Sequence, residues 1–174
     1  PMGDMGEGAL AEQWQGDYAA WSSKQGEIRS IKVEGKVVAP RKMDGMFSGY
    51  SNLEHADLRG FDTIVNASTM SRLFSGCASL ESLDLSTFIT IYCWGMGDMF
   101  SGCPSLRKIA LGSGFSFKGA DGDDRKCSFP KLDADGLTGY WQNEAGETFR
   151  EDEIPSFKNA TYTAQEGERA LDWK

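Results

Sequence analysis

The sequence predicts an α/β solenoid, in which short strands stack into a parallel β-ladder and a capping segment closes each end. Two observations predict this fold. One segment returns three times at a nearly constant spacing, and each copy carries the apolar pattern of a short strand. The composition agrees, because 21 of the 174 residues are glycine, well above the typical ~7%, which indicates many tight turns.

The three copies begin at Met43, Met70 and Met96, which are 27 and 26 residues apart. They read MDGMFSGYSNL, MSRLFSGCASL and MGDMFSGCPSL. Each copy continues as L-x-x-L-x-L, with apolar residues at Leu53, Ala56 and Leu58, at Leu80, Leu83 and Leu85, and at Leu106, Ile109 and Leu111. A weaker first copy at Ile28, Ile31 and Val33 lacks the Met-Phe-Ser-Gly part, as expected of a terminal rung with one neighbour.

The spacing within a copy predicts its local structure. The last two apolar residues of L-x-x-L-x-L face the same side of a strand, and strands recurring about every 26 residues stack ~4.8 Å apart over a common core. The Met and Phe residues lie at i, i+3, i+4, which predicts a helical turn that closes the opposite wall. Gly49, Gly76 and Gly102 then end each turn in a left-handed conformation. An exposed Met-aromatic ligand groove is the alternative, which the period shared with the leucines disfavours.

The chain divides into a capping segment at 1–27, about four rungs of leucine-rich repeat at 28–117, and a loop with a hairpin cap at 118–174. Trp14, Tyr18 and Trp21 are spaced by four and three, so we expect an amphipathic helical cap over the first rung, with a partner-binding helix as the alternative. Residues 140–142 and 147–149 flank a glycine-containing turn, which predicts a β-hairpin that closes the open end of the solenoid.

The segment MSRLFSGCASLESLDLSTF, residues 70–88, resembles the repeat of the BspA-type leucine-rich surface proteins of bacteria, which is related to repeats in mycoplasma surface lipoproteins. The resemblance covers roughly residues 28–117. Residues 139–149, 153–155 and 160–162 are similar to the segment that often follows the last repeat. The resemblance implies a leucine-rich-repeat solenoid, a cell-surface or secreted location, and adhesion or binding of host macromolecules, with no catalytic residues.

The sequence departs from the pattern of this family in three places. Tyr50 stands where the repeat prefers Cys, and Ile89 replaces the aspartate that usually follows the aromatic residue. The connector 91–95, IYCWG, is not the usual Ser/Asn-rich stretch. Because of these changes, the resemblance does not predict the path of the main chain directly after Phe88.

Charge and composition exclude several classes of function. The net charge of -8 opposes binding to nucleic acid or to an anionic membrane surface. No apolar run approaches the ~18 residues of a membrane span, and the start PMGD lacks the pattern of a secretory signal. We therefore expect a soluble chain, and one that begins at Pro1 is expected to be a processed or trimmed piece.

Metal and cofactor sites find little support. Five oxygen donors lie close in sequence, namely Asp121, Asp123, Asp124, Asp133 and Asp135. A calcium loop starting at Asp133 would place Leu137 at position 5 and Gly136 at position 4, which breaks the EF-hand pattern. Zinc is disfavoured because the chain has one histidine and no C-x-x-C pair. We expect solvated turn aspartates, no metal and no cofactor.

A nucleophilic enzyme would need a base, and His55 is the only imidazole, which we expect to be an ordinary surface residue. Hydrolysis by paired carboxylates stays open. Cys77 and Cys103 occupy equivalent positions, so the spacing permits a disulfide, although buried free thiols are favoured. Cys93 and Cys127 could pair across the C-terminal loop, which is the less favoured alternative.

The repeat predicts a solenoid without catalytic residues, and the resemblance to the BspA-type proteins implies a non-catalytic bacterial surface or secreted module that binds an extracellular protein or glycan. The expected partner face comprises the outward strand positions, namely Glu54, His55, Asp57, Glu81, Ser82, Asp84, Arg107, Lys108 and Ala110. One alternative is a hydrolase of cell-surface polymers using Asp121, Asp123, Glu151 and Asp152. Another is a structural spacer for a separate module. The ligand and the oligomeric state are not predicted.

Overall fold

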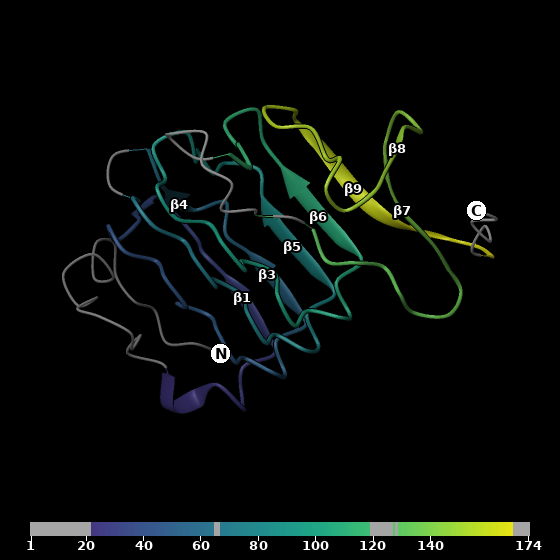
Figure 1. The fold of residues 1–174 in the computed structure, drawn as a ribbon. Coiled ribbons are helices and arrows are strands. Elements are labelled where there is room, and N and C mark those ends of the chain that lie inside the picture. The colour runs from purple at the N-terminus through teal and green to yellow at the C-terminus, as the bar shows by residue number, and fades with distance from the viewer. Residues whose placement is uncertain (1–21, 65–66, 119–126, 128, 169–174) are drawn as a thin grey trace.

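The computed structural model describes residues 22–64, 67–118, 127 and 129–168, which form a β-solenoid of about three turns (Figure 1). Its main ladder consists of four parallel strands, β1 (Ser30–Lys32), β3 (His55–Asp57), β5 (Ser82–Leu85) and β6 (Lys108–Leu111). A second parallel pair, β2 (Val37–Val38) with β4 (Phe61–Asp62), forms another side of the coil. The four predicted strand positions therefore each hold a strand.

The register of the ladder follows the repeat. Ile31 pairs with Ala56, Ala56 with Leu83, and Leu83 with Ile109. All four side chains are buried, while their neighbours along each strand face outward. The register is fixed because a slip by one residue would turn the whole apolar column toward solvent.

The repeated segment between strands is not helical. The only helix among the described residues is the 3-10 turn η1 (Ser22–Lys24), so the structure does not confirm the α/β class and the helical turns predicted at the Met and Phe residues are wrong. Hydrogen bonding explains the difference. The N–H of Met46 bonds the carbonyl of Met43 within its own turn at 3.2 Å, whereas the N–H of Phe47 bonds the carbonyl of Leu73 in the next coil at 2.9 Å. In an α-helix each N–H bonds the carbonyl four residues earlier, so the N–H of Phe47 would bond Met43 and not Leu73.

The predicted core residues of the three full copies are buried, whereas Ile28 and Val33 of the weaker first copy are partly buried. Phe47, Phe74 and Phe100 form a stack through the coils, with ring centroids 5.5 and 6.3 Å apart. The glycines that end the three turns have φ of +77°, +77° and +72°, as predicted for Gly49, Gly76 and Gly102. The Met and Phe side chains thus line the interior, as their shared period with the leucines predicts.

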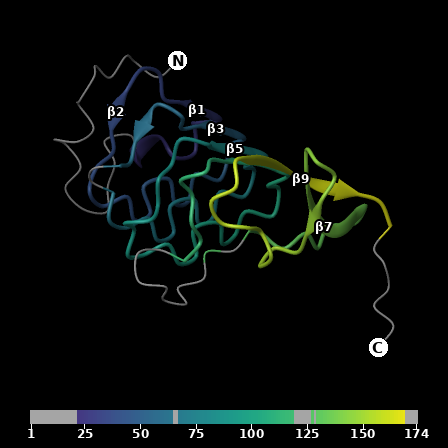
Figure 2. The same cartoon turned by 90° about the horizontal axis from the view of Figure 1, so that it is seen from above.

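The C-terminal part extends the main sheet. The predicted hairpin is confirmed as β7 (Leu137–Asn143) with β8 (Thr148–Phe149), in which Trp141 pairs with Phe149. However, the strand that pairs with β6 is β9 (Ala160–Glu166), which runs antiparallel to it, and β7 pairs with the far side of β9. Figure 2 shows β9 and β7 continuing the sheet beyond the stacked coils. The ladder edge is therefore covered by β9 and not by the hairpin.

The helical cap predicted from Trp14, Tyr18 and Trp21 lies outside the described residues. Among the helices that the structure describes, none has the length and apolar character to cross a bilayer.

Candidate functional site

The nine residues predicted to form a partner face lie together on the main ladder. Row by row, the register aligns His55 with Ser82 and Lys108, and Asp57 with Asp84 and Ala110. Glu54, Glu81 and Arg107 precede the strands and are joined in series, because the N–H of each later residue bonds the carbonyl of the earlier one. None of the nine is an apolar residue of the core cluster. We call this surface the ladder face.

Two aspartates of the ladder face, Asp57 on β3 and Asp84 on β5, are bound by neighbouring residues of the fold. The guanidinium of Arg59 bonds both carboxylate oxygens of Asp57, at 2.9 and 2.6 Å, and lies 3.4 Å from the carboxylate of Asp84. The hydrogen bond from Arg59 lowers the pKa of Asp57. Asp84 also accepts the N–H of Ser86 at 3.0 Å, which closes a turn at the end of β5. These two carboxylates are thus engaged within the fold.

His55 and Ser82 contact each other across the ladder. The Nδ1 of His55 is hydrogen-bonded to the Oγ of Ser82 at 2.8 Å, and the imidazole is exposed. A serine nucleophile needs a base oriented by a third group and donors for the developing oxyanion. Within the described part of the chain, no carboxylate is hydrogen-bonded to this imidazole. The pair therefore resembles a surface contact between rungs, in line with the expectation for His55.

The remaining charges give the ladder face a polarity along the stack. Glu54 is paired with Arg29 at 2.5 Å, and Arg107 donates to the carbonyls of Pro104 and Leu106. Glu81 and Lys108 are exposed, and neither side chain has a hydrogen-bond or ion-pair partner among the described residues. The middle of the face is acidic and its end near β9 is basic.

The sequence interpretation missed the continuation of this surface onto β9. Lys108 pairs with Thr163 and Ala110 pairs with Thr161, so the outward rows run on for another strand. The signal was present in ATYTAQE, where Ala160, Tyr162 and Ala164 are buried and the residues between them are not. Such alternation is typical of a strand with one buried face.

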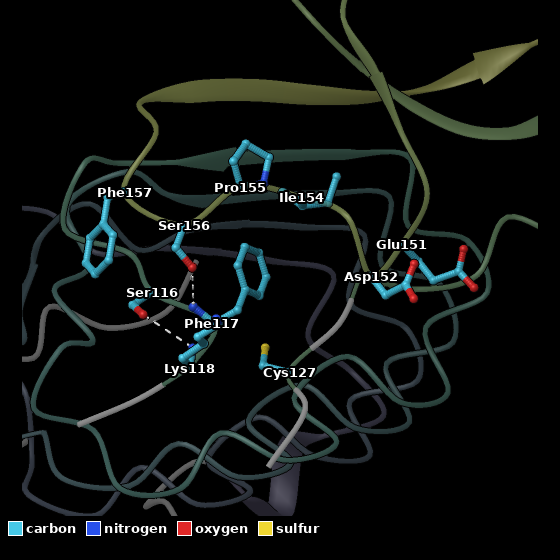
Figure 3. A pocket seen from close by; sticks show the side chains of 10 residues that line it. All are labelled: Ser116, Phe117, Lys118, Cys127, Glu151, Asp152, Ile154, Pro155, Ser156 and Phe157. Carbon is cyan, nitrogen blue, oxygen red and sulfur yellow. Dashed lines mark hydrogen bonds between the residues drawn. The ribbon is translucent and has the colours of Figure 1, made fainter. Parts of the chain in front are cut away.

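Two acids of the hydrolase alternative, Glu151 and Asp152, line a separate cavity of about 410 Å³ (Figure 3). Glu151 and Asp152 lie on one side of this cavity, and Ser156 lies on another, where its Oγ accepts the N–H of Phe117 at 3.0 Å. Asp121 and Asp123 lie outside the described residues. The four acids of that hypothesis are thus not brought together by anything that the structure describes.

Metal and disulfide sites are also absent from the described residues. No group of three or more His, Cys, Asp or Glu side chains there could hold a metal ion. All four cysteines are free and buried, so neither of the permitted disulfides is formed. The Sγ of Cys77 donates to the carbonyl of Phe47 at 3.0 Å, and that of Cys103 donates to the carbonyl of Phe74 at 3.1 Å. The repeat cysteines thus bond each coil to the one before it.

The fold and the ladder face define the class of this protein as a β-solenoid with a parallel ladder and a polar outer sheet surface. No family model, curated protein or solved structure matches the chain.

Proposed function

We propose that this protein is a non-catalytic binding module of a bacterial cell surface, or a secreted one, that captures an extracellular protein or glycan through the ladder face. The observation that carries the proposal is the alignment of polar side chains on adjacent strands at fixed spacing. Side chains in such a row are already ordered by the sheet, so they lose little conformational entropy when a partner binds. The resemblance of the repeat to BspA-type surface proteins supports the location and the class of ligand.

The chemistry of the ladder face supports binding more than catalysis. Its side chains are polar and lie on a sheet, and several of them are held by neighbours, as Arg59 holds Asp57 and Asp84. Held side chains make a preorganised contact surface. Glu81 and Lys108 are the exposed charges best placed to meet a partner, because neither side chain is held by a hydrogen bond or a close ion pair among the described residues. The charge of Lys108 acts on Glu144 only at longer range.

The proposal is tested by screening the purified protein against immobilised extracellular-matrix proteins and glycans. Saturable capture is expected for at least one of them. The double variant Glu81→Ala/Lys108→Ala should weaken that capture by roughly tenfold, the effect of losing about 1.4 kcal/mol of contacts. The matched control Lys42→Ala/Asp135→Ala also removes one charge of each sign, from exposed positions off the ladder face, and should leave capture unchanged.

Two results would count against the proposal. Absence of binding to every member of the panel would remove the support for an adhesive role. Equal loss of capture in both double variants would show that the ladder face is not the contact surface. Circular dichroism on each variant confirms that the fold is kept.

A further inference from the structure

The repeated turns carry a second hydrogen-bonded ladder, formed by alternate main-chain N–H groups. In the first coil, Gly45, Phe47 and Gly49 donate to carbonyls of the second coil at 2.9, 2.9 and 2.8 Å. In the second coil, the equivalent donors are Arg72, Phe74 and Gly76, which bond the carbonyls of Gly97, Met99 and Ser101 at 2.9, 2.9 and 2.8 Å. Each row of donors is thus covered by carbonyls on alternate residues of the next coil.

The third coil ends this ladder. Its equivalent donors are the N–H groups of Asp98, Phe100 and Gly102, and no acceptor for them lies in the part of the chain that the structure describes. The other sides of the same coil are closed. β9 covers β6, and the N–H of Phe157 bonds the carbonyl of Phe115 at 2.7 Å. The turn side is therefore left with a row of unsatisfied donors that point along the stack.

These donors border a groove, which we call the end groove. Its volume is about 520 Å³, and it lies between residues 98–104 on one side and residues 129–131 with Glu151 on the other. Because Phe129 packs against Phe100, the far wall leaves no room for a complete further coil. The space suits a single layer of main chain.

We propose that the end groove binds an extended, basic peptide segment of a partner protein, whose alternate main-chain carbonyls accept the N–H groups of Asp98, Phe100 and Gly102. The two earlier coils support a peptide, because an identical row of donors is covered there by peptide carbonyls at every second residue. Addition of a peptide to an open hydrogen-bonding edge is a common recognition mode. This site is separate from the ladder face, so the two proposals stand or fall independently.

Charge determines the kind of peptide. Two carboxylates, those of Asp98 and Glu151, line the end groove, whereas the ammonium of Lys131 lies 3.8 Å from the carboxylate of Asp133. The chain as a whole carries a net charge of -8. Lysine or arginine side chains on the bound segment would therefore be attracted, and acidic segments would be repelled.

The unsatisfied donors are tested first, by amide hydrogen exchange on the intact protein followed by NMR. The amides of Asp98, Phe100 and Gly102 should exchange much faster than those of Arg72, Phe74 and Gly76, which are hydrogen-bonded. Equal protection of the two rows would overturn the proposal, because the donors of the third coil would then already have acceptors.

Binding is tested by titrating the labelled protein with a capped octapeptide of alternating lysine and threonine. The amide protons of Phe100 and Gly102 should shift downfield and saturate, while those of Phe74 and Gly76 stay in place. The isosteric double variant Asp98→Asn/Glu151→Gln should weaken the affinity roughly fivefold, since it removes two exposed charge contacts of modest strength.

The controls separate the alternatives. The matching octapeptide of glutamate and threonine, and inorganic phosphate alone, should leave Phe100 and Gly102 unshifted. Equal shifts with phosphate would show a simple anion site and overturn peptide recognition. Absence of shifts with the lysine peptide, or shifts confined to the ladder face, would overturn the end groove as a peptide site.

Discussion

The ring of Phe129 meets the ring of Phe100 edge-on, with 6.0 Å between their centroids, and this contact ends the phenylalanine stack of the repeats. Phe129 also packs edge-on against Phe117, Trp141 and Tyr162 at 5.7, 4.9 and 5.6 Å. One buried side chain therefore joins the last coil to β7 and β9. Without it, the stacked core would end on an uncovered ring.

Substitution of Phe129 by alanine should lower the free energy of unfolding by about 3 to 5 kcal/mol, because it leaves a cavity among four aromatic rings. Urea denaturation followed by tryptophan fluorescence measures this loss. Phe157 is 56% exposed, and Phe157→Ala serves as a control that should cost less than about 1 kcal/mol. Similar losses in both variants would argue against Phe129 as the closure of the core.

Tyr50 occupies the position where the later copies have cysteine, and its buried hydroxyl has no hydrogen-bond partner among the described residues. The variant Tyr50→Phe should therefore raise the free energy of unfolding by about 1 kcal/mol, since it removes an unsatisfied polar atom and keeps the ring. In the control Tyr140→Phe, the hydroxyl lost is one that accepts from Arg150 at 3.2 Å, so no gain is expected. Thermal melts of the two variants decide the matter.

Alkaline pH should destabilise the protein. Burial raises the pKa of the Tyr50 hydroxyl to about 12 and that of the Cys93 thiol to about 11. The unfolded chain therefore loses these protons first, so their contribution to stability is complete below about pH 8 and falls as the pH rises toward 11 and 12. Urea midpoints between pH 8 and pH 11 should decrease, and Tyr50→Phe should reduce the slope. A flat profile would contradict these pKa shifts.

Gly112 should tolerate no side chain. A Cβ atom at this position would lie 1.8 Å from the main-chain oxygen of Ser86 in the preceding coil. The variant Gly112→Ala should therefore cost about 3 kcal/mol or more, because backbone must move. At Gly97 a Cβ would meet no atom within 4 Å, so Gly97→Ala should change stability by less than about 1 kcal/mol. Equal effects in the two variants would contradict this close approach.

The strands of the ladder could be predicted from the sequence because the apolar residues repeat in step. The spacing of Leu83 to Ile109 fixes which residues face each other, and the structure confirms it. The turns could not be predicted in the same way. Apolar residues at i, i+3, i+4 suit both a helical turn and consecutive β-turns, and the pattern does not reveal that the N–H of Phe47 bonds the next coil.

The ladder face could be predicted as a set of positions, since outward residues follow from the buried ones. The sequence does not predict which of these charges are held within the fold. Arg59 lies after β3, and only the structure shows that its guanidinium contacts both Asp57 and Asp84. The contact of Phe129 with Phe100 could not be predicted either, because Phe129 lies outside every repeat and only the fold brings the two rings together. The end groove could not be predicted, because it depends on unsatisfied main-chain N–H groups and the residue types do not indicate which of these groups lack an acceptor.

The left-handed conformation of Arg72 offers a last prediction. Its φ is +56°, and the equivalent residue of the first coil is Gly45, with φ of +61°. The left-handed region costs a residue with a Cβ roughly 1 to 2 kcal/mol, of which the greater freedom of glycine in the unfolded chain returns about half. The variant Arg72→Gly should therefore raise the free energy of unfolding by about 0.5 to 1 kcal/mol. Ser75 lies in the same turn without a positive φ, so Ser75→Gly should instead lower stability by a similar amount. Denaturation midpoints that move in the same direction for both variants would contradict this account of the turn.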